Sequence, residues 1–203
     1  MTLQNRVMPE GEIVADPARG LVMGNRGILH DGVQQLGTAR WRHPHWITCV
    51  IAFSGRKRPL MQPGAYTELF FLDEAVALAA GHRPCAECRS LAYRRFRAAW
   101  RAGTGLPDTA PAIDKALHAA RVTRNRLQVR HQARLETLPD SVFVLWDGDP
   151  HLWHNGSLRR FTPTGYGPAL PGEGTVTVLT PSPLVLTLSA GYRPILHPSL
   201  DVP

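Results

Sequence analysis

The stretch FFLDEAVALAAGHRPCAECR, residues 70–89, decides how this sequence folds and what it can bind. It begins with an aromatic pair and continues into an alanine-rich segment, which Asp73 can cap as a helix and Gly81 can end. Pro84 cannot continue a helix, so the chain must turn at this point. The turn presents a Cys-Ala-Glu-Cys motif at residues 85–88, directly after a short helix.

The cysteine pair at residues 85–88 has three interpretations. A redox pair normally follows a strand in a βαβ unit, whereas an expected helix precedes this pair. Two buried thiols would have apolar neighbours, but Glu87 lies between these cysteines and Arg83 and Arg89 lie beside them. A zinc half-site fits best, because two intervening residues let one tight turn aim both thiolates at one ion.

A zinc site needs four ligands, and the chain has only one further cysteine. Cys49 lies on an expected strand that a hairpin ending at Phe71 can return to the pair. We therefore predict that Cys49, Cys85 and Cys88 bind Zn²⁺. Histidine, carboxylate or water must complete the site, and His45 is favoured because it leads into the Cys49 strand. The other histidine candidates are His30, His43 and His82.

The stretch around the cysteine pair resembles the second half of the N-terminal metal-binding domain of the Ada family, the adaptive-response methyltransferases of bacteria. The resemblance covers roughly residues 46–89. Its motifs are Phe70-Phe71, Ala79-Ala80-Gly81, Arg83-Pro84-Cys85 and Cys88-Arg89. It implies a small zinc-centred core of β-hairpin and helix, in which Cys85 and Cys88 match the later cysteine pair of the family and Cys49 the first.

In that family four thiolates hold zinc, and one of them takes a methyl group from a methylated DNA phosphate. By this resemblance Cys49 is the candidate catalytic residue. Phe53 stands where the fourth cysteine would fall, so this chain departs from the family pattern. Three thiolates carry less negative charge than four, which makes each bound sulfur a poorer nucleophile. Water in the fourth position would instead make the ion a Lewis acid, so whether the chain is an enzyme stays open.

Basic residues flank the expected zinc site. The net charge of +7 and the pI near 10.0 favour an acidic partner, because each phosphate contact releases counterions. All basic residues except Lys57 and Lys115 are arginines, whose forked donors suit phosphate, although they could equally form a solvated face. The residues that we expect to bind DNA or RNA are Arg56, Lys57 and Arg58 in the hairpin and Arg89, Arg94, Arg97 and Arg101 along the next helix.

The rest of the chain predicts an α+β protein, in which the Ada-like core is extended by a C-terminal antiparallel β meander with short helices. Helices are expected over residues 74–80, 90–102, 113–121 and 182–190. Strands are expected over residues 46–53, 67–71, 141–146, 151–154, 158–162 and 175–180. Asp147-Gly148 and Asn155-Gly156 are the expected hairpin turns of the meander, because both pairs tolerate positive φ.

The sequence divides into three regions, which can pack as one domain. Residues 1–102 form the Ada-like metal-binding region with N-terminal strands, 103–140 a helical basic connector, and 141–203 a β-rich C-terminal region. No run of about 18 uncharged apolar residues exists, so no contact with a membrane is expected. The first residues lack the form of a secretion signal, and we therefore expect a cytoplasmic protein.

Three functions follow from these observations. The leading hypothesis is a zinc-containing DNA-binding protein that recognises or repairs DNA damage. The second is a metal-dependent nuclease or other hydrolase of nucleic acid, with His45 or His82 as general base beside the ion. The third is a structural zinc site in a protein of unrelated function.

Overall fold

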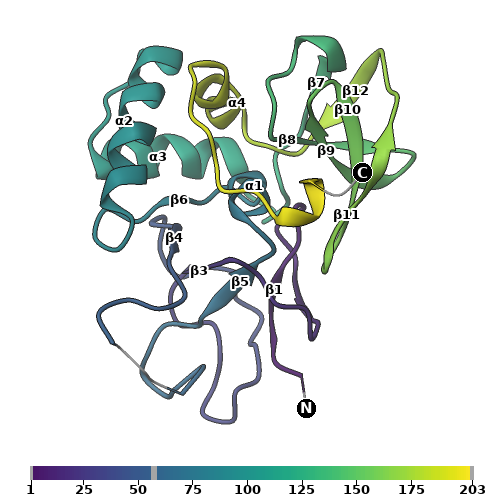
Figure 1. Ribbon diagram of the computed structural model, residues 1–203. Helices are drawn as coiled ribbons and strands as arrows, with labels where there is room; N and C mark the ends of the chain where they lie inside the picture. Colours follow the sequence, from purple (N-terminus) through teal and green to yellow (C-terminus); the bar gives the residue numbers. More distant parts are fainter. Residues whose placement is uncertain (1, 56–58, 202–203) are drawn as a thin grey trace.

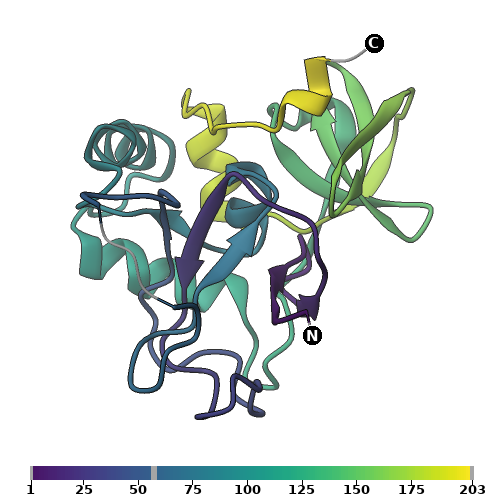
Figure 2. The same ribbon diagram turned by 60° about the horizontal axis from the view of Figure 1, so that its bottom comes forward.

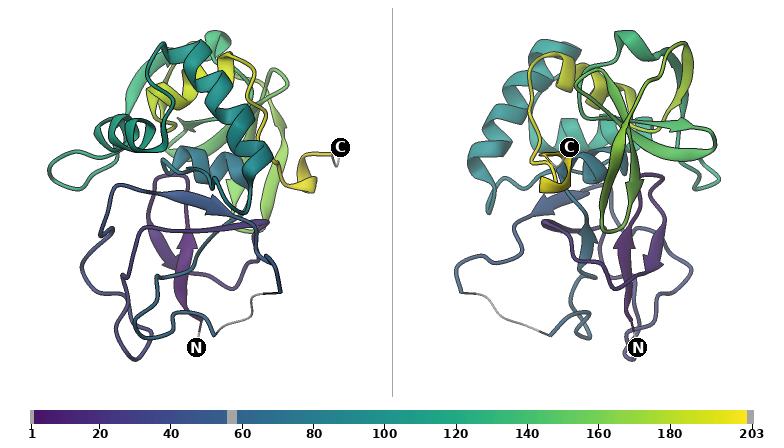
Figure 3. Two further views of the ribbon diagram at one scale, coloured as in Figure 1. Left: turned by 90° about the vertical axis from the view of Figure 1, so that its left-hand side faces the viewer. Right: turned by 45° about the vertical axis from the view of Figure 1, so that its right-hand side comes forward.

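The computed structural model describes residues 2–55 and 59–201. Figure 1 shows a first sheet in the lower half of the molecule, a group of helices at the upper left and a second sheet at the upper right. The described residues contain two six-stranded sheets and four α-helices, which confirms the α+β class. The views in Figure 3 agree that the helices and the second sheet lie together on one side of the first sheet.

The first sheet carries the cysteine-bearing strand and has the order β2-β1-β5-β3-β4-β6. Strand β4 pairs antiparallel with β3 and parallel with β6, so that Thr48 lies opposite Pro84. This register brings the end of β4 beside the turn that follows β6. The strands are β1 (Gln4–Val7), β2 (Ile13–Ala15), β3 (Val22–Asn25), β4 (Ile47–Cys49), β5 (Leu69–Phe71) and β6 (Arg83–Pro84).

The expected hairpin between residues 46 and 71 is wrong. Strands β4 and β5 do not pair, because β3 lies between them and bonds to both. Gly24 allows this close approach, since a Cβ atom there would lie 2.1 Å from the carbonyl oxygen of Ile47. The Ada-like hairpin core is therefore not confirmed, and the cysteines meet through the pairing of β4 with β6 instead.

The second sheet has the order β11-β10-β9-β8-β12-β7. Strands β8, β9 and β10 form the predicted meander, and all four residues of the two expected turns have positive φ. Strand β7 pairs with β12, so part of the expected connector belongs to this sheet. The strands are β7 (His131–Arg134), β8 (Val142–Trp146), β9 (Asp149–His154), β10 (Ser157–Thr162), β11 (Gly165–Leu170) and β12 (Thr175–Val178).

A short buried helix, α1, joins the two sheets. Asp73 caps it as predicted, since its carboxylate accepts a hydrogen bond of 3.0 Å from the amide of Val76. Gly81 follows the helix with φ of +83°, which a residue without a Cβ atom adopts easily. All six residues of α1 are buried, and most of them share one core with strands of both sheets. Figure 2 shows this helix between the two sheets.

The remaining helices cover the side of α1 that faces away from the first sheet. Phe96 and Trp100 on α2 pack with residues of α3, α4 and the second sheet in another core. The structure confirms the predicted helices, although α2 and α3 each extend beyond the expected residues. The helices are α1 (Glu74–Ala79), α2 (Ser90–Thr104), α3 (Ala110–Arg121) and α4 (Ser182–Ser189), with 3-10 turns at Leu135–Thr137 and Pro198–Asp201.

Candidate metal centre

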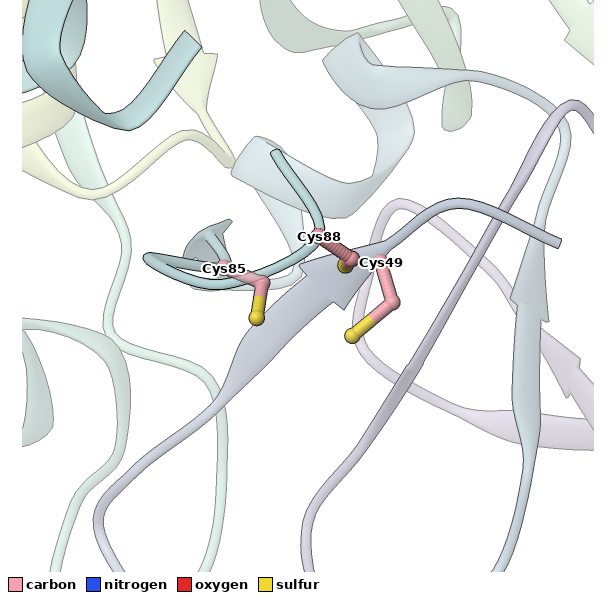
Figure 4. A group of neighbouring side chains, drawn as sticks. All are labelled: Cys49, Cys85 and Cys88. Atoms are coloured by element: carbon pink, nitrogen blue, oxygen red, sulfur yellow. The ribbon is translucent and has the colours of Figure 1, made fainter. Parts of the chain in front are cut away.

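Three cysteines from separate segments converge at the edge of the first sheet. Cys49 ends β4, Cys85 directly follows β6, and Cys88 lies in the turn before α2. Their Sγ atoms all lie within 4.8 Å of one another, and Figure 4 shows them around one small space. A tetrahedral zinc ion with Zn–S bonds of about 2.3 Å would hold its sulfurs about 3.8 Å apart. The three thiols therefore fit a metal ion after small side-chain movements.

Backbone hydrogen bonds fix the two ends of this cluster. The amide of Cys85 donates to the carbonyl oxygen of Thr48 over 2.8 Å, which extends the pairing of β4 with β6. The amide of Arg89 then donates to the carbonyl oxygen of Cys85 over 3.3 Å and closes the turn that presents Cys88. The cluster thus rests on secondary structure rather than on a free loop.

A buried ion pair lies directly behind the cysteines. Arg89 donates to Glu74 over 2.6 Å and to the hydroxyl of Thr48 over 2.9 Å. Glu74 also accepts a hydrogen bond of 2.6 Å from Tyr192 and one of 3.0 Å from the amide of Ile195. Because Thr48 precedes Cys49 and Arg89 follows Cys88, this network fixes the position of Cys49 relative to Cys88.

This network corrects the prediction for Arg89. Its side chain is only 3% exposed and its guanidinium is paired with Glu74, so its charge is engaged inside the protein rather than offered to nucleic acid. Burial alone lowers the pKa of Arg89, but the Glu74 carboxylate outweighs burial and the net shift is upward. Arg89 therefore supports the cysteine cluster from the protein interior.

The three thiols do not have equal acidity. The pKa of Cys85 is lowered to about 5, mainly because the thiol of Cys49 donates a hydrogen bond to its sulfur, and backbone amides of Cys88 and Glu87 add to this. The pKa of Cys49 is raised for the same reason, and burial raises that of Cys88. A thiolate is the form that binds metal, so the cluster already favours one negative sulfur before an ion enters.

His45 lies near the cluster but is not part of the group of ligand atoms around the three sulfurs. Its Nδ1 atom is 2.8 Å from a carboxylate oxygen of Asp114, and the side chains are 56% and 2% exposed. Arg83 holds the same carboxylate with two bonds of 2.7 and 2.8 Å. His45, Asp114 and Cys85 line one shallow cavity of about 340 Å³. When a carboxylate holds the Nδ1 atom of a histidine, the Nε2 atom can bind a metal ion or accept a proton.

Among the described residues, the other histidine candidates do not join the group of ligand atoms around the three sulfurs. Both ring nitrogens of His30 have partners, Thr67 at 2.7 Å and the carbonyl oxygen of Gln62 at 3.2 Å. His82 is fully buried, and its Nε2 accepts a hydrogen bond from Arg26. Burial and the nearby arginines lower the pKa of His82 well below its usual value. His43 accepts a hydrogen bond of 3.2 Å from the amide of His45, which turns its Nδ1 atom toward the backbone.

The arginines predicted to bind phosphate do not form one surface. Arg94 and Arg101 are exposed along α2, whereas Arg97 is paired with Asp108 at 3.1 Å. Sequence reasoning overlooked Arg95, which is exposed and lines a cavity of about 370 Å³ together with Cys88 and Arg193. The predicted hairpin residues Arg56, Lys57 and Arg58 lie outside the described residues.

Two carboxylates that support the site were also missed. Glu74 lies 15 residues from Arg89, and Asp114 lies 31 residues from Arg83, so no local pattern links either pair. One signal was available for Glu74, since it is the single charged residue inside the apolar helix that precedes the cysteines. A charge inside a buried segment needs a partner.

A comparison of this chain with protein-family models, curated proteins and solved structures finds no match. Among the described residues, no helix has the length and apolar character needed to cross a membrane. The three-sulfur cluster is therefore the feature from which a function can be argued.

Proposed function

We propose that the three cysteines of this chain hold a Zn²⁺ ion and that the face around them binds nucleic acid, in the recognition or repair of DNA damage. The observation that carries the proposal is the convergence of the Cys49, Cys85 and Cys88 sulfurs within 4.8 Å. Thiolates select zinc and other soft ions over magnesium or calcium. The Arg89–Glu74 pair behind the cluster provides the rigid support that metal sites need.

Basic side chains next to Cys88 support the nucleic-acid part of the proposal. Arg95 and Arg193 line the same cavity as Cys88, and both are exposed. Arg94 and Arg101 are further exposed basic residues of α2. A strand of nucleic acid that follows α2 would bring its phosphates past the metal site, where guanidinium forks bind phosphate well.

The proposal is tested by measuring zinc content and DNA affinity together. We expect one zinc per chain in the wild type and none in Cys85→Ser. Fluorescence anisotropy should show that Arg95→Gln weakens binding and lowers the slope of log affinity against log salt by about 1, since one phosphate contact is lost. Arg124→Gln is the matched control, because Arg124 is exposed on another part of the chain. DNA affinity that is insensitive to salt and to Arg95→Gln would contradict the nucleic-acid part.

Repair would make Cys49 the methyl acceptor. Its sulfur would bond to the methyl carbon of a methylated phosphate while the C–O bond breaks, which leaves an ordinary phosphodiester anion. This reaction is stoichiometric, so DNA carrying methylphosphotriesters should lose at most one methyl group per chain. Mass spectrometry should then find the methyl group on the Cys49 peptide. Methyl loss from DNA without modification of that peptide would contradict the assignment.

A second function, hydrolysis of nucleic acid, is favoured by the pairing of His45 with Asp114. Asp114 fixes the ring of His45 in the cavity that Cys85 also lines, which is the arrangement of a general base beside a metal ion. His82 does not suit this role, because it is fully buried. Turnover of an oligonucleotide that is abolished by EDTA, and by His45→Gln with zinc retained, would support hydrolysis. Zinc-loaded wild-type protein that shows no turnover would exclude it.

A further inference from the structure

A second feature, separate from the cysteines, is a pair of buried arginines against one tryptophan. The guanidinium carbons of Arg26 and Arg121 lie 4.0 and 3.9 Å from the ring centroid of Trp46. All three residues are only 2% exposed. Buried cations beside a tryptophan gain from the aromatic ring, but the ring does not neutralise their charge.

Neither arginine has a carboxylate bound to its guanidinium among the described residues. Arg26 donates to the carbonyl oxygen of Gly11 and to His82, and Arg121 donates to the carbonyl oxygens of Gly81 and Pro44. Asp114 attracts Arg121 electrostatically, but its oxygens already bond to Arg83 and His45. Two buried positive charges therefore remain without an ion-pair partner.

The guanidinium groups of Arg26 and Arg121 also have buried N–H donors without an acceptor among the described residues. Nη2 of Arg26 and Nε of Arg121 have no hydrogen-bond partner in the described chain. The pKa of each arginine is lowered to about 9, first by burial and then by repulsion, from Arg40 for Arg26 and from Arg26 for Arg121. A buried charged donor without a partner is costly, and a bound anion would remove that cost.

These arginines line a cavity of about 500 Å³. Arg40, Arg126 and Arg130 line it as well, so five arginines face two glutamates, Glu10 and Glu12. Gly11 forms part of the wall beside Arg26, since a Cβ atom there would lie 3.9 Å from the unsatisfied Nη2 atom. The unsatisfied Nη2 atom of Arg26 therefore lies beside a residue of the cavity lining that has no side chain.

We propose that this cavity binds a phosphorylated small molecule, with its phosphate group against Arg26 and Arg121. Guanidinium forks bind phosphate oxygens with paired hydrogen bonds, and a dianion would neutralise both buried charges. The cavity has the size of ordinary small-molecule sites, so it also has room for an organic group. Trp41 is half-buried at this cavity, 5.6 Å from the ring of Trp46, and provides an aromatic surface for that group.

The proposal does not depend on nucleic-acid binding. None of the five arginines lies on α2, and none lines the cavities beside Cys85 and Cys88. Failure of DNA binding would leave this site untouched, and failure of this site would leave the metal centre untouched.

Isothermal titration calorimetry of the zinc-loaded, full-length protein tests the site with AMP, ribose 5-phosphate and inorganic phosphate, and with adenosine as the probe without phosphate. We expect at least one phosphorylated probe to bind, and AMP to bind at least tenfold more tightly than adenosine, since charge-assisted hydrogen bonds contribute on this scale. The phosphorylated probe with the highest affinity shows whether the site prefers phosphate alone, a sugar phosphate or a nucleotide.

Two substitutions and one control complete the test. Arg126→Gln removes an exposed arginine of the cavity and should weaken AMP binding about tenfold, whereas Arg124→Gln, two residues away and outside the cavity, should leave it unchanged. Arg121→Lys keeps the buried charge but removes the fork, and should weaken binding further. The proposal is overturned if no phosphorylated probe binds, if adenosine binds as tightly as AMP, or if Arg124→Gln weakens binding as much as Arg126→Gln.

Discussion

Glu74 is the residue on which the support of the cysteine cluster depends most. It is buried and neutralises Arg89, which is also buried. Glu74→Gln would leave the arginine charged without a counterion, so we expect the free energy of unfolding to fall by about 3–5 kcal/mol. Urea denaturation of the zinc-loaded protein measures this loss.

Arg160→Gln is the matched control for Glu74→Gln. Arg160 forms an ion pair of similar length with Asp149, but the two side chains are 59% and 48% exposed. An exposed pair of this kind contributes about 0–1 kcal/mol. Equal losses in the two variants would show that the Glu74–Arg89 pair does not support the site as described.

Asp73 gives the protein a stability that depends on pH. Burial raises the pKa of Asp73 to about 6, although hydrogen bonds from Val76, Tyr166 and His197 oppose the shift. The folded state therefore binds this proton more tightly than the unfolded chain, whose aspartates titrate near pH 4. The contribution of Asp73 to the free energy of unfolding is therefore fully present below about pH 4 and is lost as the pH rises through about 6.

Asp73→Asn tests the pH dependence, because asparagine cannot titrate. Both proteins keep the same zinc ligands, so the difference in their unfolding free energies isolates Asp73. The wild type should gain about 1 kcal/mol relative to the variant on going from about pH 7.5 to about pH 5. A difference that stays constant between these pH values would contradict the raised pKa.

At the scale of elements, Gly81 joins α1 to β6 and so places Cys85. Its φ is +83°, and a Cβ atom would lie 2.5 Å from Cδ of Arg121. Gly81→Ala should therefore cost about 1–2 kcal/mol for backbone strain and more for displacing Arg121, as measured by urea denaturation. Gly105→Ala is the control, because Gly105 has φ of +67° with open space around it and should cost only the strain. Equal costs would contradict a tight contact between Gly81 and Arg121.

Local signals explain which elements could be predicted. The cap of α1 and the two turns of the meander depend on neighbouring residues, so Asp73 and the Asp-Gly and Asn-Gly pairs were sufficient to place them. Strands β1, β2 and β6 have two to four residues each; β1 and β6 pair with the distant strands β5 and β4, and among the described strands β2 pairs only with β1. Their short sequences carry too little periodicity to be recognised.

At the scale of the whole molecule, the cysteine cluster depends on a pairing that the sequence does not encode locally. Cys85 and Cys88 could be predicted as metal ligands because their spacing suits one ion. The sequence predicts that a hairpin brings Cys49 to Cys85 and Cys88. In the structure the parallel pairing of β4 with β6 does so, and β3 separates β4 from β5. The sequence indicates that Glu74 needs a partner, but it does not identify Arg89, because their pairing depends on the meeting of α1 with the start of α2.

Zinc-edge X-ray absorption of the purified protein shows whether three sulfurs of one chain hold a single zinc ion. We expect one zinc per chain, with three sulfur neighbours at about 2.3 Å and one nitrogen or oxygen neighbour at about 2.0–2.1 Å. Loss of the sulfur signal in Cys49→Ser, Cys85→Ser and Cys88→Ser would agree with this arrangement. Zinc with only nitrogen and oxygen neighbours, or protein that contains no metal and has three freely reactive thiols, would contradict it.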